Sequence, residues 1–168
     1  KKRFKFSSLQ KMIDRYSRKQ LKDIWEDQNK YSIWLDIELA AAEAMEKFKI
    51  IPKGVVKKVK SKSKINVKRI LEIEGNVKHD VIAFLTSITE KAGKEARYLH
   101  KGMTSSDVLD TCFNLQLKQS GEIILSDINI LLKSIKKQAL KHKMTLCIGR
   151  SHGIHAEPIT FGLKLLTF

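Results

Sequence analysis

The chain has 168 residues, of which 42% are hydrophobic, and it carries a formal net charge of +15. This apolar content is enough for a domain with a core and excludes an intrinsically disordered chain. Only two prolines and eight glycines are present. Because a many-stranded sheet needs a turn roughly every 8 to 12 residues, such sparse breakers favour long helices.

The two cysteines, Cys112 and Cys147, do not form a C-x-x-C pair. A metal cluster and a disulfide framework are therefore not indicated, and we expect no metal and no cofactor. No apolar run reaches the roughly 18 residues of a membrane span, and the N-terminus lacks the apolar core of a signal peptide. We therefore expect a cytoplasmic protein that binds no membrane.

Much of the positive charge is local. Residues 1–11 are basic, precede Met12 and are expected to form a tail outside the fold. Residues 49–69 contain nine lysines or arginines and no acid, but they lack aromatic side chains on which bases could stack. Across the chain 27 lysines outnumber 6 arginines, although bidentate phosphate recognition favours arginine. A solvated lysine-rich surface therefore explains the charge better than nucleic-acid binding does.

The apolar spacing predicts helices through the first half of the chain. Ser17 opens an S-x-x-Q capping box, and apolar positions then recur at near-helical spacing, which predicts one helix over 17–48. Shorter helices are predicted over 55–60 and 67–73. A further helix is expected to begin near Asp80, an acid suited to a helix N-terminus, and to run until Gly93.

A much longer helix is predicted next. Thr104 begins a second capping box, T-S-S-D, and apolar positions continue at helical spacing to about residue 142. Such a length is typical of a bundle whose helices run side by side, within one subunit or across several. Residues 158–168 are predicted to begin another helix. The chain stops at Phe168 on apolar sequence without a cap, so we expect it to be truncated.

Residues Gly149 to Pro158, which read G-R-S-H-G-I-H-A-E-P, crowd two histidines, a hydroxyl, an arginine and a carboxylate between two apolar segments. Gly149 and Gly153 permit backbone conformations that a side chain would forbid, so we expect an irregular connection that carries Ser151 and His152. A histidine there can give or take a proton near neutral pH, because its unperturbed pKa is about 6.5. Taken alone, the segment is equally compatible with a polar loop between helices.

Two further histidine-bearing segments, K-H-D at 78–80 and H-K-G-M-T-S-S-D at 100–107, each sit at a predicted break or helix start. Helix N-termini present unpaired N–H groups and partial positive charge, so they bind carboxylates and phosphates. His79 would add a switchable donor at one start, and the hydroxyls of Thr104 and Ser105 would add donors at the other. Each segment alone is also compatible with an ordinary helix cap.

Four segments carry a family resemblance: R-Y-S at 15–17, K-H-D-V-I-A-F at 78–84, M-T-S-S-D-V-L-D-T at 103–111 and G-R-S-H-G-I-H-A-E-P-I-T-F-G at 149–162. Together they resemble the bacterial type of adenylosuccinate lyase, a family of the fumarase and aspartase superfamily. The resemblance covers the chain from about Met12 to its end, in order and without large gaps. The R-Y pair and the H-A-E-P continuation resemble this family more than its superfamily relatives.

The resemblance implies an all-α fold, in which this chain supplies an N-terminal helical domain over 12–103 and the incomplete start of a central helical bundle over 104–168. It implies elimination of fumarate from adenylosuccinate, which gives AMP, and from succinyl-aminoimidazole carboxamide ribotide, in purine nucleotide biosynthesis. Members of the family are homotetramers that pair their central helices, and each active site takes residues from three subunits. The implied partners are these small-molecule substrates and not nucleic acid.

The resemblance also assigns residue roles. By its position in the motif, His152 matches the general acid that protonates the leaving nitrogen. His100 matches a histidine close to the substrate phosphate. The full set of positions that match substrate-binding residues is Arg15, Tyr16, Lys78, His79, Asp80, His100, Thr104, Ser105 and Ser151.

The sequence also departs from the family pattern. Ser151 stands where threonine is usual, and Lys101 follows His100 where an aromatic residue is more usual. The family's base is a serine on a loop with the signature S-S-x-M-P-x-K-x-N-P, which these 168 residues lack, so the fragment alone is expected to be inactive. Two alternatives stay open: another lyase of the superfamily, such as argininosuccinate lyase, and a basic helical module that binds nucleic acid with steep salt dependence.

Overall fold

The computed structural model describes residues 13–168, so the tail expected over residues 1–11 and the adjoining Met12 lie outside the described residues. The chain divides into two compact units, one that ends at Ser120 and one that comprises Gly121–Phe168. The division falls inside a long helix. The domain boundary expected from the sequence, between residues 103 and 104, precedes that helix and stays a prediction.

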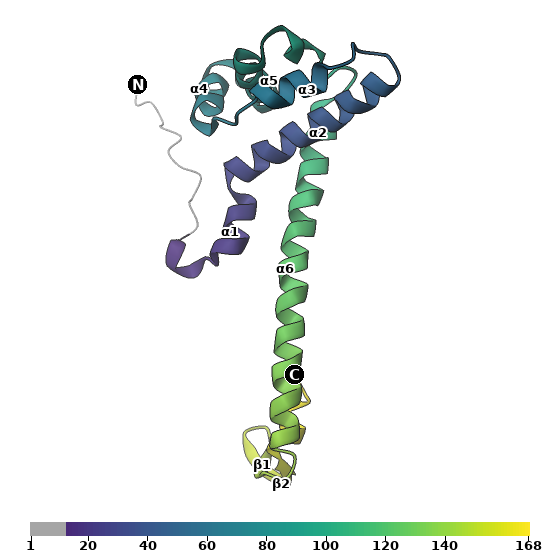
Figure 1. Ribbon diagram of the computed structural model, residues 1–168. Coiled ribbons are helices and arrows are strands. Elements are labelled where there is room, and N and C mark those ends of the chain that lie inside the picture. The colour runs from purple at the N-terminus through teal and green to yellow at the C-terminus, as the bar shows by residue number, and fades with distance from the viewer. Residues whose placement is uncertain (1–12) are drawn as a thin grey trace, which may run out of the picture. The chain divides into compact units, whose positions relative to one another are not determined.

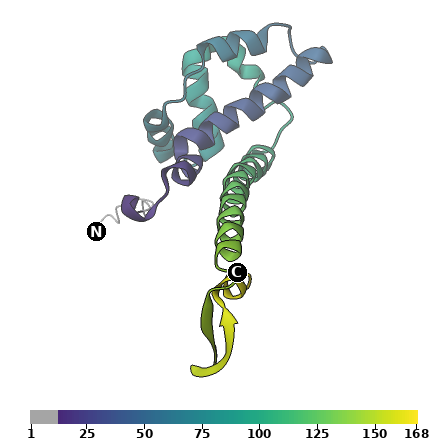
Figure 2. The same cartoon turned by 60° about the horizontal axis from the view of Figure 1, so that its bottom comes forward.

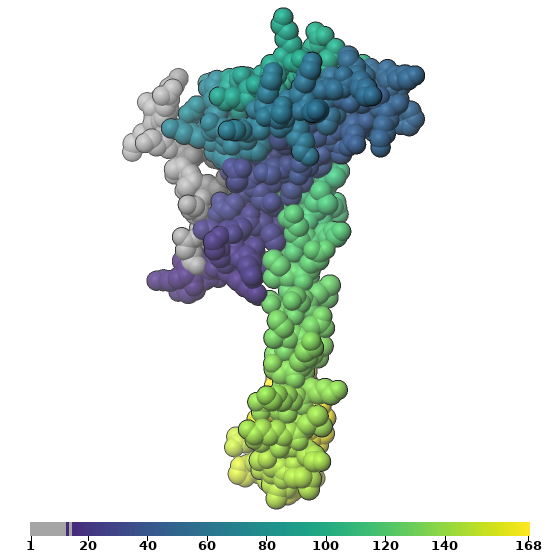
Figure 3. Space-filling model, viewed as in Figure 1, coloured from purple at the N-terminus to yellow at the C-terminus, as the bar shows by residue number. Residues whose placement is uncertain are grey.

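The first unit is helical. Its elements are η1 (Asp14–Tyr16), α1 (Lys19–Trp25), α2 (Asp27–Lys47), α3 (Val55–Lys62), α4 (Val67–Val77), α5 (Asp80–Ala92), η2 (Gly93–Tyr98) and the start of α6 (Ser105–Lys141). Figure 1 shows α3, α4 and α5 grouped along α2, and Figure 3 shows their side chains forming a continuous surface. The helical fold class expected from the sequence is confirmed.

The prediction of a single helix over 17–48 is wrong. The helix is interrupted at Glu26, whose backbone is extended with φ −73° and ψ 148°. The side-chain amides of Asn29 and Gln116 each donate to the Ile24 carbonyl at 2.8 Å. They satisfy an acceptor that a continuous helix would bond to its own backbone. The contact with Gln116 is long-range, which is why local spacing could not reveal the break.

The capping box predicted at Ser17 is also wrong. Arg18 is the N-cap of α1 and makes no capping hydrogen bond with its side chain, whereas the Ser17 hydroxyl donates to the Ile13 carbonyl at 3.0 Å. The predicted start of α6 is confirmed at Thr104, whose backbone N–H donates to the Asp107 carboxylate at 2.8 Å. The carboxylate therefore closes the N-terminal turn of α6, as a capping box requires.

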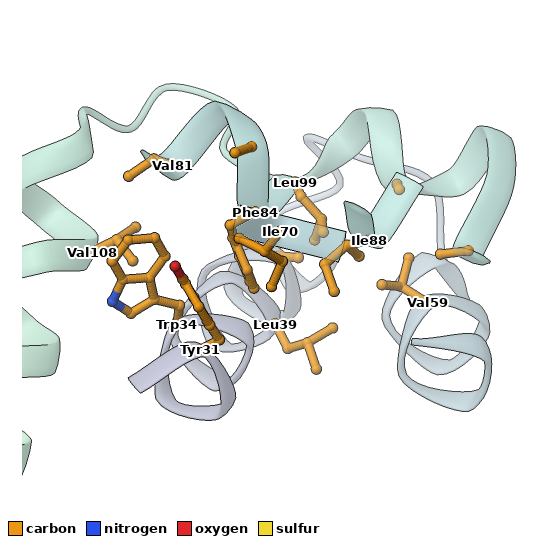
Figure 4. Packing of buried hydrophobic residues seen from close by; sticks show 14 of the residues in the cluster. Tyr31, Trp34, Leu39, Val59, Ile70, Val81, Phe84, Ile88, Leu99 and Val108 are labelled. Carbon is orange, nitrogen blue, oxygen red and sulfur yellow. The ribbon is translucent and has the colours of Figure 1, made fainter. Parts of the chain in front are cut away.

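Three aromatic side chains form the centre of the core between α2 and α5. The Phe84 ring stacks on Tyr31 at a centroid distance of 6.0 Å and meets Trp34 edge-on at 5.5 Å. Each of the three is at most 2% exposed. Figure 4 shows them packed with Ile70, Ile88 and the other labelled aliphatic residues. Burial of such rings, with offset or edge-on geometry, stabilises this unit.

An ion pair on the surface joins α4 to α5. The Arg69 guanidinium donates to both carboxylate oxygens of Glu90, from Nε at 3.0 Å and from Nη2 at 2.6 Å. These hydrogen bonds hold the pKa of Glu90 below its usual value and raise that of Arg69. A bidentate fork fixes both side chains better than a single contact would.

The second unit consists of the C-terminal part of α6, strands β1 (Leu146–Ser151) and β2 (Ile154–Thr160), and helix α7 (Phe161–Leu165). The strands pair antiparallel and form the hairpin visible as two arrows in Figure 2. The prediction of an irregular connection around Ser151 is therefore wrong. Ser151 ends β1, Ile154 begins β2, and a turn of two residues joins the strands. Pro158 is tolerated in β2 because a two-stranded sheet has a free edge on each strand.

Helix α7 lies close against the end of α6. A Cβ atom added to Gly162 would lie 2.5 Å from the Ala139 carbonyl oxygen and 2.8 Å from the Cα atom of Lys143. Only glycine fits such a backbone approach. The helix is predicted to begin at residue 158, but it begins at Phe161. Thr160 is its N-cap, and the Thr160 hydroxyl accepts from the Leu163 N–H at 3.2 Å. None of the helices in the described residues combines the length and the apolar character needed to cross a bilayer.

Candidate active site

His152 lies at the tip of the hairpin, next to Gly153 in the turn that joins β1 to β2. Ser151 pairs with Ile154, and the two turn residues between them have φ values of 52° and 77°. Two successive positive φ values define a type I′ turn, which matches the twist of a hairpin. A histidine in this conformation is uncommon, and the turn projects its imidazole from the fold as an exposed group.

The close approach of β1 to β2 requires glycine at position 149, two residues before Ser151. A Cβ atom at position 149 would lie 2.9 Å from the Glu157 carbonyl oxygen on the opposite strand. The register shifts between Ile148 and Arg150, which marks a bulge. Bulges of this kind redirect the strand beyond them. The glycine therefore helps to determine the direction in which the tip carries Ser151 and His152.

His155 occupies a different place from His152, because it lies in β2 directly opposite Arg150. A hollow of about 380 Å³ beside the hairpin is lined in part by Gly149, Arg150 and Lys164, and neither histidine lines it. Both histidines are exposed. Of the two histidines, only His152 lies in the turn and has the positive φ that this turn requires.

The K-H-D segment forms the junction between α4 and α5. Lys78 ends α4 in the left-handed conformation with φ 57°, and its ammonium donates to the Gly75 carbonyl. His79 is the N-cap of α5, and its Nδ1 accepts from the Ile82 N–H at 3.4 Å. Asp80 accepts from the Val81 N–H at 2.7 Å. The segment is thus a helix cap, and its histidine stays exposed at the start of α5.

His100 lies on the connection between η2 and α6 and has φ 59°. Both its backbone and its ring are held by Glu38 of α2. One carboxylate oxygen accepts from the His100 backbone N–H at 2.6 Å, and the other lies 2.7 Å from Nδ1. Glu38 is fully buried, whereas the His100 side chain is 21% exposed. The histidine is therefore fixed from within the core and open on its outer side.

Thr104 and Ser105 start α6, four and five residues after His100. Thr104 is exposed and Ser105 is half-buried, so both hydroxyls lie near the N-terminal end of a 37-residue helix. The His100 carbonyl accepts from the Met103 N–H at 3.4 Å. The same short loop therefore joins the histidine to the two hydroxyls.

Arg15 and Tyr16 lie in η1, at the start of the described chain. The Arg15 guanidinium stacks over the Tyr16 ring at 4.8 Å, and the ring is 75% exposed. A planar cation on an aromatic face is a common surface arrangement and leaves one face of the ring open.

The structure brings some of the predicted residues together and not others. His100, Thr104 and Ser105 share one loop and helix start, and Lys78, His79 and Asp80 share another. In the part of the chain that the structure describes, no hydrogen bond joins one group to the other. Ser151 and His152 belong to the second compact unit, and the remaining predicted residues belong to the first.

Glu38 is the site residue that sequence reasoning missed. One signal was available, because position 38 falls on the apolar stripe that includes Trp34, Leu39 and Ala42. An acid at such a position must be paired or strongly hydrogen-bonded once it is buried. No group of histidine, cysteine and acidic residues with metal-binding geometry occurs among residues 13–168.

Comparison with known proteins finds related lyases over most of the chain. The family model described as "Lyase" matches residues 6–168. The adenylosuccinate lyases of Synechocystis sp. and Bacillus subtilis are 50% and 45% identical to the chain, each over 154 residues. The aligned part is 92% of this chain and 36% of either relative. The chain thus spans little more than a third of the length of these relatives.

Solved structures with the same fold are more distant in sequence. A fumarate lyase from Mesorhizobium sp. BNC1 matches with a TM-score of 0.82 and 26% identity, over 88% of this chain and 36% of that one. A 3-carboxy-cis,cis-muconate lactonizing enzyme from Pseudomonas putida matches with a TM-score of 0.83 and 27% identity, over 94% of this chain and 38% of the other.

Proposed function

This chain belongs to the lyase family, and on that premise we propose that it forms the N-terminal part of an adenylosuccinate lyase. The enzyme would release fumarate from adenylosuccinate to give AMP, and from succinyl-aminoimidazole carboxamide ribotide to give its carboxamide ribotide. The observation that carries the proposal is the G-R-S-H-G-I-H-A-E-P hairpin, which presents His152 at a turn built to expose it. The named relatives support the choice of this substrate over argininosuccinate.

The reaction explains why these residue types are needed. A base removes the proton from the carbon next to a carboxylate, the electron pair forms the C=C bond, and the C–N bond breaks. The leaving nitrogen then needs a proton, which we assign to His152. Its exposed position suits a proton donor that acts on a group bound outside its own unit.

The other candidate residues act in binding. Thr104 and Ser105 would hold the succinyl carboxylates, because hydroxyls at a helix start add to the partial positive charge of its free N–H groups. Negative charge grows on one of these carboxylates when the proton leaves, so such donors also stabilise the intermediate. The remaining substrate-binding assignments are Arg15, Tyr16, Lys78, His79, Asp80, His100 and Ser151.

The candidate residues lie in two separate compact units and are mostly exposed, which fits a site that is completed by further chain and by other subunits. We propose that the complete enzyme is a cytoplasmic homotetramer that acts on these small molecules and does not bind nucleic acid. Residues 1–168 alone should release no fumarate, because the serine loop that supplies the base is not among them.

Fumarate release from adenylosuccinate and from argininosuccinate tests this function in the complete polypeptide that contains residues 1–168. We expect turnover of adenylosuccinate and of the carboxamide ribotide, and discrimination of several orders of magnitude against argininosuccinate, because sites that pair polar groups reject analogues strongly. Residues 1–168 alone serve as the inactive control. A folded complete protein that prefers argininosuccinate, or that releases no fumarate, would show the proposal to be wrong.

A further inference from the structure

The inference concerns Glu38, an acid in α2 that no family motif includes. Its side chain is fully buried beside the hydrophobic core. Figure 4 labels Leu39 and Leu99, the neighbours of Glu38 and His100 in the chain, within the packed core. A buried carboxylate is retained at a cost unless its oxygens are hydrogen-bonded. Here both oxygens are used, and both contacts go to His100.

The two contacts determine which ring nitrogen carries a proton. Glu38 Oε1 lies 2.7 Å from Nδ1 of His100, which is hydrogen-bonding distance. A carboxylate has only acceptor oxygens, so a hydrogen bond at this distance requires Nδ1 to donate and therefore to carry the proton. Nε2 is then the ring nitrogen that remains for another partner, on a side chain that is 21% exposed.

The same carboxylate also holds the backbone of His100. A non-glycine residue at φ 59° lies in a sparsely populated region and persists only where its surroundings enforce it. The 2.6 Å bond from the His100 N–H to Glu38 supplies that restraint. Ring and backbone are thus fixed by a single side chain from a different helix.

We propose that Glu38 is a positioning residue that locks His100 as the Nδ1–H tautomer and so presents the Nε2 lone pair to a hydrogen-bond donor of the substrate, such as a hydroxyl group. The inference rests on the proposed function for the identity of that substrate, but the tautomer itself does not. His79 provides a contrast, because its Nδ1 accepts from a backbone N–H and its proton therefore belongs on Nε2. Nε2 is the remaining ring nitrogen in both histidines, but it is an acceptor in His100 and a donor in His79.

The substitution Glu38→Gln tests whether Glu38 fixes the His100 tautomer, because it removes the carboxylate and keeps the size of the side chain. The amide offers one oxygen and one NH₂ group, so it cannot accept from both the His100 N–H and Nδ1–H. If its oxygen stays with the backbone, its NH₂ faces Nδ1, which must then give up its proton. We therefore expect the His100 ring to change to the Nε2–H tautomer. Glu43→Gln, an exposed acid on the same helix, is the matched control.

The readout is the ¹⁵N chemical shift of the ring nitrogens in the labelled 168-residue chain at neutral pH. The wild-type chain and Glu43→Gln should show a protonated Nδ1 on His100, and Glu38→Gln an unprotonated one, with His79 unchanged. An unprotonated Nδ1 in the wild type, or a protonated one in Glu38→Gln, would overturn the inference. If the variant does not fold, the wild type decides alone, through a nuclear Overhauser contact between His100 Hδ1 and the Glu38 methylene protons. Absence of that contact also overturns the inference.

A kinetic measurement separates this inference from the proposed function. In the complete polypeptide, Glu38→Gln should raise KM for adenylosuccinate by about 10- to 100-fold, with a smaller change in kcat, because Nε2–H of the variant cannot accept from the substrate donor and leaves that donor unpaired. If no adenylosuccinate is cleaved by the wild type, the proposed function fails while the tautomer result stands. If the wild type is active and the variant has an unchanged KM, the role of Glu38 in substrate binding is refuted.

Discussion

Substitution of Gly149 by alanine should loosen the hairpin that carries His152. The added Cβ would lie 2.9 Å from the Glu157 carbonyl oxygen, closer than atoms of this kind approach in proteins. Because the clash is with backbone, relief requires β1 and β2 to separate by several tenths of an ångström. Overpacking of this type costs about 1 to 3 kcal/mol. The corresponding increase in local opening is about 5- to 150-fold.

Amide hydrogen exchange of β1 and β2, followed by NMR in the 168-residue chain, measures this opening. We expect faster exchange across Leu146–Ser151 and Ile154–Thr160 and unchanged exchange in α5. Gly121→Ala is the matched control, because nothing lies within 4 Å of its added Cβ and the residue is inside α6. There alanine should slow local exchange, since it stabilises a helix by about 0.5 to 1 kcal/mol relative to glycine. Unchanged hairpin protection in Gly149→Ala would refute the close approach.

Three further predictions concern the first unit and the cysteines. Phe84→Ala should lower the free energy of unfolding by about 3 to 5 kcal/mol in urea titrations, because it removes a fully buried ring, and a loss below about 1 kcal/mol would contradict the aromatic core. A thiol reagent should modify Cys147 well before Cys112, since Cys112 is 2% exposed and burial raises its pKa; equal rates in the native chain would be inconsistent with this. Because Arg69 lowers the pKa of Glu90, their pair should stabilise the fold above the ordinary carboxyl pKa of about 4.3 and lose this effect as pH falls further. The urea midpoints of wild type and Glu90→Gln should therefore differ at pH 7 and converge in acid, whereas a constant difference would exclude the ion pair as its cause.

The elements with strong local signals were predictable from the sequence. Helix α5 begins at Asp80 and ends before Gly93, which has φ 77°, and α6 begins after the Thr104 cap as expected. In each case one residue type satisfies a local backbone requirement, so no distant contact is needed to define the boundary.

The β-hairpin could not be predicted from the sequence for a different reason. A run of two short strands joined by His152 and Gly153 lacks the Asn-Gly signal of a type I′ turn, and Pro158 argues against a strand. The break at Glu26 and the Glu38 contact were hidden because both depend on residues far away in the sequence. Gln116 lies 92 positions from Ile24, and His100 lies 62 positions from Glu38.

The role of His152 as the acid of the elimination is tested most directly by kcat in the complete polypeptide that contains this chain. His152→Asn removes the imidazole but keeps a residue that suits the left-handed turn position, so the hairpin should persist. We predict that kcat for adenylosuccinate falls by about 10²- to 10⁴-fold with little change in substrate binding, whereas His155→Gln stays within about tenfold of wild type. Near-normal kcat in folded His152→Asn, or a larger loss in His155→Gln, would contradict the assignment.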